Sequence, residues 1–114
     1  MNGNAKKWVK ALRSGKYTQA KAALRNENGF CCLGVACDLY GKANKVKWTE
    51  DDVFLGHSDI LPAEVMAWLG LETDEGTYTS GNHRMTSLAT RNDAGVKFPQ
   101  IADIIEAEPE GLFA

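Results

Sequence analysis

The 114-residue sequence contains no long hydrophobic run. Its longest apolar stretch, residues 30–36, is far shorter than the roughly 20 residues that a membrane-spanning helix needs. The first seven residues also lack the apolar segment of a signal peptide. We therefore expect no membrane partner and a cytoplasmic location.

Nucleotide-binding motifs with a defined glycine spacing are absent as well. Neither G-x-x-x-x-G-K-[ST] nor G-x-G-x-x-G occurs, so ATP-driven chemistry has no support. The chain has only two histidines, His57 and His83, each isolated in a polar, turn-rich stretch that is typical of surface residues. We expect no cofactor and no bound metal.

The three cysteines, Cys31, Cys32 and Cys37, all lie in the most apolar segment of the chain, within a span of seven residues. An odd number of cysteines in a reducing compartment argues against a disulfide framework, and the spacing lacks the paired C-x2-C of a zinc site. We expect small buried side chains here, because nothing in the sequence places a base beside a thiol.

Acidic pairs are weak evidence for hydrolysis. Asp51 with Asp52, and Asp74 with Glu75, lie in polar loops without a histidine partner, where carboxylates are usually solvated. The sequence therefore favours a protein that is not an enzyme.

Length and composition predict one domain. A chain of 114 residues with 44% hydrophobic and 25% charged residues is typical of a soluble globular protein with one core. We expect residues 1–114 to form a single compact domain of the α+β class, mainly helical, with about four short helices and at most a small antiparallel sheet.

Helical periodicity places those helices. Apolar residues at i, i+3, i+4 and i+7 predict a helix over residues 4–14, and similar patterns predict helices over 31–40, 61–70, 85–92 and 98–108. Gly41 is expected to end the second of these. Asn28-Gly29 is the favoured pair for a tight hairpin, and residues 73–84 are expected to form a loop with one edge strand.

Charge is divided unevenly along the chain. Residues 1–47 contain ten of the thirteen Lys and Arg against two acids, a net charge of +8, whereas residues 48–114 have a net charge of −10. Such a division indicates either that the basic and acidic parts pair across one fold, or that a basic face binds an anionic partner.

The junction after the first helix interleaves cations with an aromatic ring and an amide. Arginine can bind phosphate oxygens bidentately, tyrosine can stack on a base, and glutamine can read a polar edge. We predict an anion-binding site at Arg13, Lys16, Tyr17, Gln19, Lys21 and Arg25. Lys6, Lys7 and Lys10 are interpreted as a solvated helix face.

The C-terminal helix pair has the spacing of a helix-turn-helix with a glycine in the turn. A DNA-reading helix exposes Arg, Lys, Asn or Gln, whereas this one would expose Asp103, Glu106 and Glu108. Double-stranded DNA is therefore a disfavoured partner.

Four segments together resemble a family of small proteins encoded by tailed bacteriophages and prophages. The most specific are F-C-C-L-G-V-x-C at residues 30–37 and N-D-x-G-x-x-F at residues 92–98, and the others are residues 8–19 and 61–71. The resemblance implies an accessory protein in the cytosol of a bacterial host, and it implies no catalytic residue.

Two functions follow as expectations. In the first, a non-enzymatic counter-defence protein captures a phosphate-bearing small molecule, such as a nucleotide signal, at the basic junction, closed by Arg84 or Arg91 of a symmetry mate in a homo-oligomer. In the second, the acidic part docks a host protein. Its residues would be Glu50, Asp51, Asp52, Asp74 and Glu75.

Overall fold

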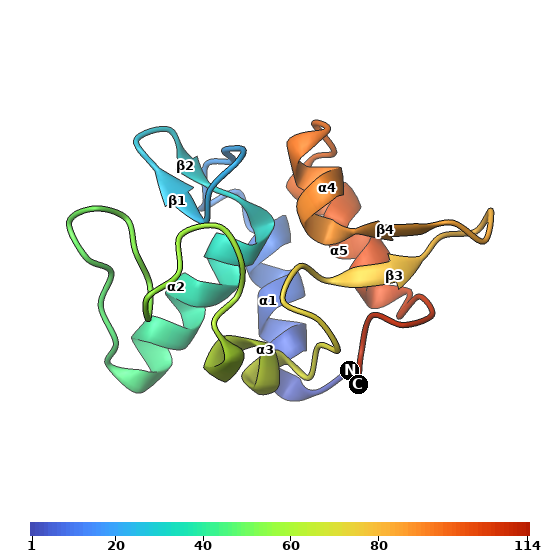
Figure 1. Ribbon diagram of the computed structural model, residues 1–114, viewed down its shortest axis with the longest axis horizontal. Helices are drawn as coiled ribbons and strands as arrows, with labels where there is room; N and C mark the ends of the chain where they lie inside the picture. Colours follow the sequence, from blue (N-terminus) through green and yellow to red (C-terminus); the bar gives the residue numbers. More distant parts are fainter.

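Five helices and two small antiparallel hairpins make up the computed structural model, which describes residues 1–114 (Figure 1). The mainly helical α+β class is confirmed. In chain order the elements are α1 (Gly3–Arg13), β1 (Arg25–Asn26), β2 (Gly29–Phe30), α2 (Cys32–Asn44), α3 (Ala63–Leu69), β3 (Thr77–Thr79), β4 (Met85–Ser87), α4 (Leu88–Asp93) and α5 (Phe98–Glu106).

Helix α1 is held at the centre of the fold by its apolar stripe. Ala5, Trp8, Val9 and Leu12 are all buried, as the periodicity predicts. The indole Nε1 of Trp8 donates a hydrogen bond of 2.9 Å to the backbone oxygen of Cys32, which fixes α1 against the first turn of α2. Since the opposite face of α1 stays exposed, its lysines are available at the surface.

Helix α2 is longer than the sequence indicates. It continues past Gly41, the predicted stop, to Asn44, and the cap residue Lys45 has a left-handed backbone with φ of 58°. Gly41 is buried, and a Cβ there would lie 2.5 Å from the backbone oxygen of Val46. The glycine therefore permits a close approach of the following chain, and the prediction that it caps the helix is wrong. The predicted burial of all three cysteines is confirmed.

The two hairpins both differ from the prediction in detail. Asn26 pairs with Gly29, so the tight turn consists of Glu27 and Asn28, one residue earlier than predicted. The segment from Met85 to Ser87 is strand β4, paired with β3, and the predicted helix start at Met85 is wrong. Ser87 caps α4 by accepting a 3.0 Å hydrogen bond from the Thr90 amide, and the helix therefore begins at Leu88.

Asn92 joins the two most specific sequence segments. Its side chain is completely buried, accepts a 3.1 Å hydrogen bond from the Cys32 amide and donates one of 2.8 Å to the oxygen of Ala20. Its neighbour Asp93 accepts from the amide of Ala22 at 3.0 Å. These bonds anchor the irregular chain between α1 and β1, and they give the paired motifs a structural role.

One hydrophobic core contains 22 buried residues drawn from all five helices. None of the helices combines the length and the apolar character that crossing a bilayer requires.

Candidate anion-binding groove

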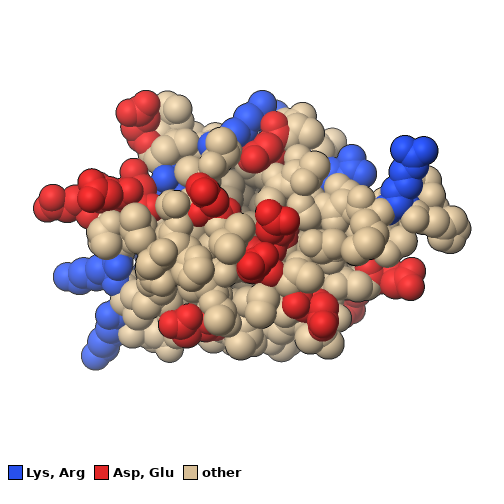
Figure 2. Space-filling model, in the orientation of Figure 1, with Lys and Arg blue, Asp and Glu red and all other residues tan.

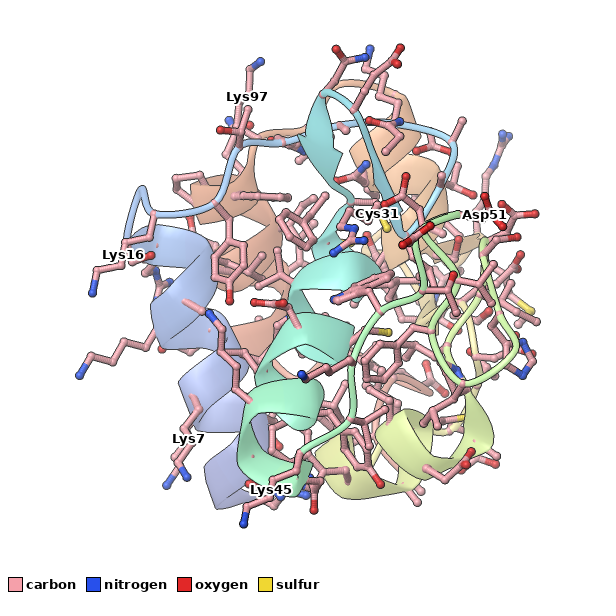
Figure 3. The ribbon with its side chains drawn as sticks, turned by 90° about the vertical axis from the view of Figure 1, so that its left-hand side faces the viewer. Lys7, Lys16, Cys31, Lys45, Asp51 and Lys97 are labelled. Carbon is pink, nitrogen blue, oxygen red and sulfur yellow. The ribbon has the colours of Figure 1, made fainter.

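A hollow lies where α1 and α2 run side by side (Figure 3). This first hollow has a volume of about 500 Å³. Basic and apolar residues both contribute to its lining. It is lined by Lys7, Lys10, Ala11 and Ser14 of α1, by Lys16 and Tyr17 beyond α1, by Phe30 of β2, and by Asp38, Leu39 and Lys42 of α2.

Two aromatic rings form part of the first hollow. Tyr17 packs edge-on against Phe30 with ring centroids 5.1 Å apart. The Tyr17 hydroxyl donates a 2.6 Å hydrogen bond to Oδ2 of Asp38. Burial, together with this bond to the carboxylate, raises the pKa of Tyr17. The hydroxyl therefore stays protonated and remains a donor at neutral pH.

A second hollow of about 620 Å³ adjoins the first and shares Asp38 and Lys42 with it. Trp48 is one of its walls, and the guanidinium of Arg25 lies over that indole, 4.5 Å from the ring centroid. Arg25 also pairs with Asp52 at 2.6 Å. The remaining lining residues are Gly41, Lys45, Val46 and Lys47. The first and second hollows are together called the groove.

Asp38 stands at the boundary between the hollows and is the only acid that lines either of them. Its Oδ2 accepts the hydrogen bond from the Tyr17 hydroxyl and forms an ion pair of 3.1 Å with the Lys42 ammonium. Its Oδ1 accepts a hydrogen bond of 3.2 Å from the indole Nε1 of Trp48. The Asp38 carboxylate raises the pKa of Lys42. The carboxylate is thus largely neutralised by its own neighbours.

The groove is strongly positive. Seven cations line it against the one carboxylate, and five of the seven form no ion pair. Those five are Lys7, Lys10, Lys16, Lys45 and Lys47. A lining that combines unpaired lysines with aromatic and aliphatic side chains is suited to an anion that also carries a flat apolar group.

The residues predicted for the basic junction are divided among several surroundings. Lys16 and Tyr17 line the first hollow and Arg25 lines the second. Arg13 turns toward α5, where it pairs with Asp103 at 2.6 Å and with Glu106 at 3.0 Å. Lys21 is exposed and lines neither hollow.

Gln19 has a structural position. Its Nε2 donates to Oδ1 of Asn92 at 2.9 Å and to the oxygen of Val96 at 2.8 Å, and its Oε1 accepts from the Phe98 amide at 3.1 Å. Of the two arginines assigned to a symmetry mate, Arg84 is exposed between β3 and β4, and Arg91 donates to the Tyr78 hydroxyl at 3.3 Å. Neither lines the groove of its own chain.

Sequence reasoning missed the contribution of α2 to the site. Asp38 and Lys42 are four residues apart, which places them on one face of α2, and Lys45 follows as the cap of that helix. That spacing was a usable signal, together with the excess of bases before residue 48. The rest of the missed set is Lys7, Lys10, Phe30, Lys47 and Trp48.

The groups considered for catalysis are unreactive or scattered. Burial raises the pKa of the Cys31 thiol to about 11, and burial also raises the pKa values of Cys32 and Cys37. The thiols are therefore protonated at neutral pH. No three His, Cys, Asp or Glu residues come together in a way that could hold a metal ion.

The chain belongs to the family described as Domain of unknown function (DUF8296), which matches residues 1–109. No curated protein and no solved structure matches the chain.

Proposed function

We propose that this protein is a non-enzymatic binding protein that captures a phosphate-bearing small molecule, such as a nucleotide, in the groove between α1 and α2. The observation that carries the proposal is the first hollow, whose lining combines unpaired lysines with Tyr17 and Phe30. The lysines can supply charge-assisted hydrogen bonds to phosphate oxygens, and the aromatic and aliphatic lining can supply contact area for a base.

The groove modifies the sequence-based hypothesis. Arg13 and Gln19 are occupied by bonds within the fold, so the proposed contacts pass to lysines of α1 and α2. The protonated, buried thiols support a role in binding in preference to nucleophilic chemistry. Together with the resemblance to tailed-phage proteins, these features favour sequestration of a nucleotide signal in the cytosol of an infected bacterium, which is the counter-defence role that we propose.

The adjacent lysines Lys6 and Lys7 provide a matched test. Both are exposed residues of α1, but only Lys7 lines the first hollow. We expect calorimetric titration with 5′-AMP, 5′-GMP, ATP and GTP to detect binding of at least one of them. Lys7→Ala should weaken that binding about tenfold, whereas Lys6→Ala should change it by no more than about twofold.

Two results would contradict this proposal. One is the absence of binding by all four nucleotides at millimolar concentration, and the other is an equal loss in both lysine variants. Chromatography of the bound nucleotide after prolonged incubation tests the non-enzymatic role, because the ligand should be recovered unchanged.

A second candidate is docking of a basic host protein by the acidic part. Acidic side chains are spread over one face of the molecule (Figure 2), and Asp51 lies on the opposite side from Lys7 and Lys16 (Figure 3). Charge reversal at Glu50 and Asp51 should then slow association with the partner and weaken its salt dependence. Unchanged association kinetics would count against docking. We do not adopt DNA binding, since the exposed Asp103 and Glu106 of α5 would repel a duplex.

A further inference from the structure

The groove is longer than one phosphate group can occupy. Along α2 and its cap, the lining residues run from Asp38 to Lys45, a distance of about 10 Å at the helical rise per residue. Asp38 and Lys42 line both hollows and therefore lie at the boundary between them. A ligand that uses the whole groove must extend across that boundary.

Each hollow has its own unpaired cations, and the carboxylate of Asp38 is shared by both hollows. Lys7 and Lys16 are unpaired cations of the first hollow, and Lys45 and Lys47 are unpaired cations of the second. The Asp38 carboxylate between them repels a phosphate, although its ion pair with Lys42 reduces that repulsion. This arrangement favours two phosphate positions with an uncharged group between them.

The middle of the groove also has a hydrogen-bond acceptor to offer. The side chain of Asp38 is 16% exposed. Its Oδ2 already interacts with two donors, Tyr17 and Lys42, whereas Oδ1 accepts only from Trp48. A carboxylate has about four acceptor positions, so Oδ1 can accept one more N–H donor.

Aromatic rings continue from one hollow to the other beside this acceptor. Tyr17 contacts Phe30, and the ring centroids of Phe30 and Trp48 are 6.0 Å apart. A nucleobase has N–H groups that can donate a hydrogen bond to Asp38, and it has a flat face that can pack against aromatic rings. The uncharged group in the middle of the groove is therefore best matched by a base.

We infer that the ligand is a dinucleotide, with one phosphoryl group on the lysines of each hollow and a base N–H group donated to Asp38. This inference rests on the proposed function and specifies its ligand class. A mononucleotide fills one hollow, whereas a dinucleotide fills both. The second hollow then determines ligand size.

The test compares the linear dinucleotides pApA and pGpG with 5′-AMP and 5′-GMP by calorimetric titration. We expect at least one dinucleotide to bind about tenfold or more tightly than its mononucleotide. A variant with Lys45→Asn and Lys47→Ala should lose that advantage, because its dinucleotide affinity should fall by a larger factor than its mononucleotide affinity. Asparagine is chosen at position 45 because it tolerates the left-handed backbone. Lys6→Ala is the control outside the groove.

Intrinsic fluorescence gives an independent readout. Of the three tryptophans, only Trp48 lines the groove. The dinucleotide should quench tryptophan emission, and Trp48→Phe should remove that quenching.

The outcomes separate this inference from the proposed function. Equal affinity for mononucleotides and dinucleotides, with no effect of the Lys45 and Lys47 changes, would overturn the inference and leave nucleotide capture standing. An equal loss of both affinities in that variant would overturn it too, because the second hollow would then act only through long-range charge. Failure of every mononucleotide and dinucleotide to bind would overturn both proposals.

Discussion

Gly34 shows how closely two segments approach one another at a single residue. A Cβ at this position in α2 would lie 1.7 Å from the backbone oxygen of Leu24. Real side chains do not occupy such a position, and the obstacle is backbone, which cannot rotate away. The glycine in the Cys-Cys-Leu-Gly-Val segment is therefore required by packing between α2 and the chain that leads into β1.

Gly34→Ala tests this contact. In an ordinary helix interior, alanine is about 1 kcal/mol more favourable than glycine. Here we expect the substitution to lower the free energy of unfolding by about 3 kcal/mol or more, or to prevent folding. Gly3→Ala is the matched control, since nothing lies within 4 Å of a Cβ there. Urea denaturation measures both variants, and a Gly34→Ala protein as stable as the wild type would refute the contact.

Some site residues could not be assigned from the sequence. Lys6 and Lys7 are adjacent and chemically identical, and only the position of α2 makes Lys7 part of a hollow. Gln19 had the right chemistry to read a polar ligand, but its amide is used by Val96 and Phe98, 77 and 79 residues away. Contacts over such separations leave no periodic signal in one sequence.

Among the elements, α2 combines a groove face with a thiol-rich core face. The pKa of Cys31 is raised by burial from 9.0 to about 11, and the other two thiols shift in the same direction. An unfolded thiol ionises near its ordinary pKa, whereas the folded thiol retains its proton. Ionisation therefore favours the unfolded chain, and the stabilising effect of the raised pKa is complete only below about pH 9.

We expect the free energy of unfolding to fall as the pH rises from about 9 toward 11. Each thiol contributes at most about 1.4 kcal/mol per pH unit in this window. Urea denaturation under reducing conditions at about pH 7.5, 9 and 10.5 measures the slope. Cys31→Ala should give a shallower slope, and a wild-type stability that stays constant between pH 9 and 10.5 would contradict the burial of the thiols.

Helices with a regular apolar stripe could be predicted from the sequence. The short strands and the end of α2 could not, because they are set by contacts. The stripes of α1 and α5 are buried as expected. The strands β3 and β4 have three residues each, too few for alternation to be detected. The sequence did not predict the C-terminal end of α2, because a glycine such as Gly41 usually ends a helix. The glycine occurs within the helix because the backbone oxygen of Val46 approaches it closely.

Across the whole molecule, some of the N-terminal cations pair with acids of residues 48–114, and others stay unpaired. Arg13 and Arg25 pair with acids from the C-terminal part of the chain, so the two parts do contact each other. Of the lysines of the N-terminal part that form no ion pair, five line the groove. The sequence revealed the excess of positive charge, but the direction in which each cation points depends on how α1 and α2 pack.

The central claim is that an anionic ligand binds between α1 and α2. The most direct measurement is a titration of the ¹⁵N-labelled protein with 5′-AMP, 5′-GMP, ATP, GTP, pApA and pGpG, followed by backbone amide chemical shifts. The account predicts saturable shifts concentrated at Lys7, Tyr17, Phe30 and the segment from Asp38 to Trp48, with α5 unaffected. Shifts concentrated at α5 or between β3 and β4, or no shifts at all, would contradict it.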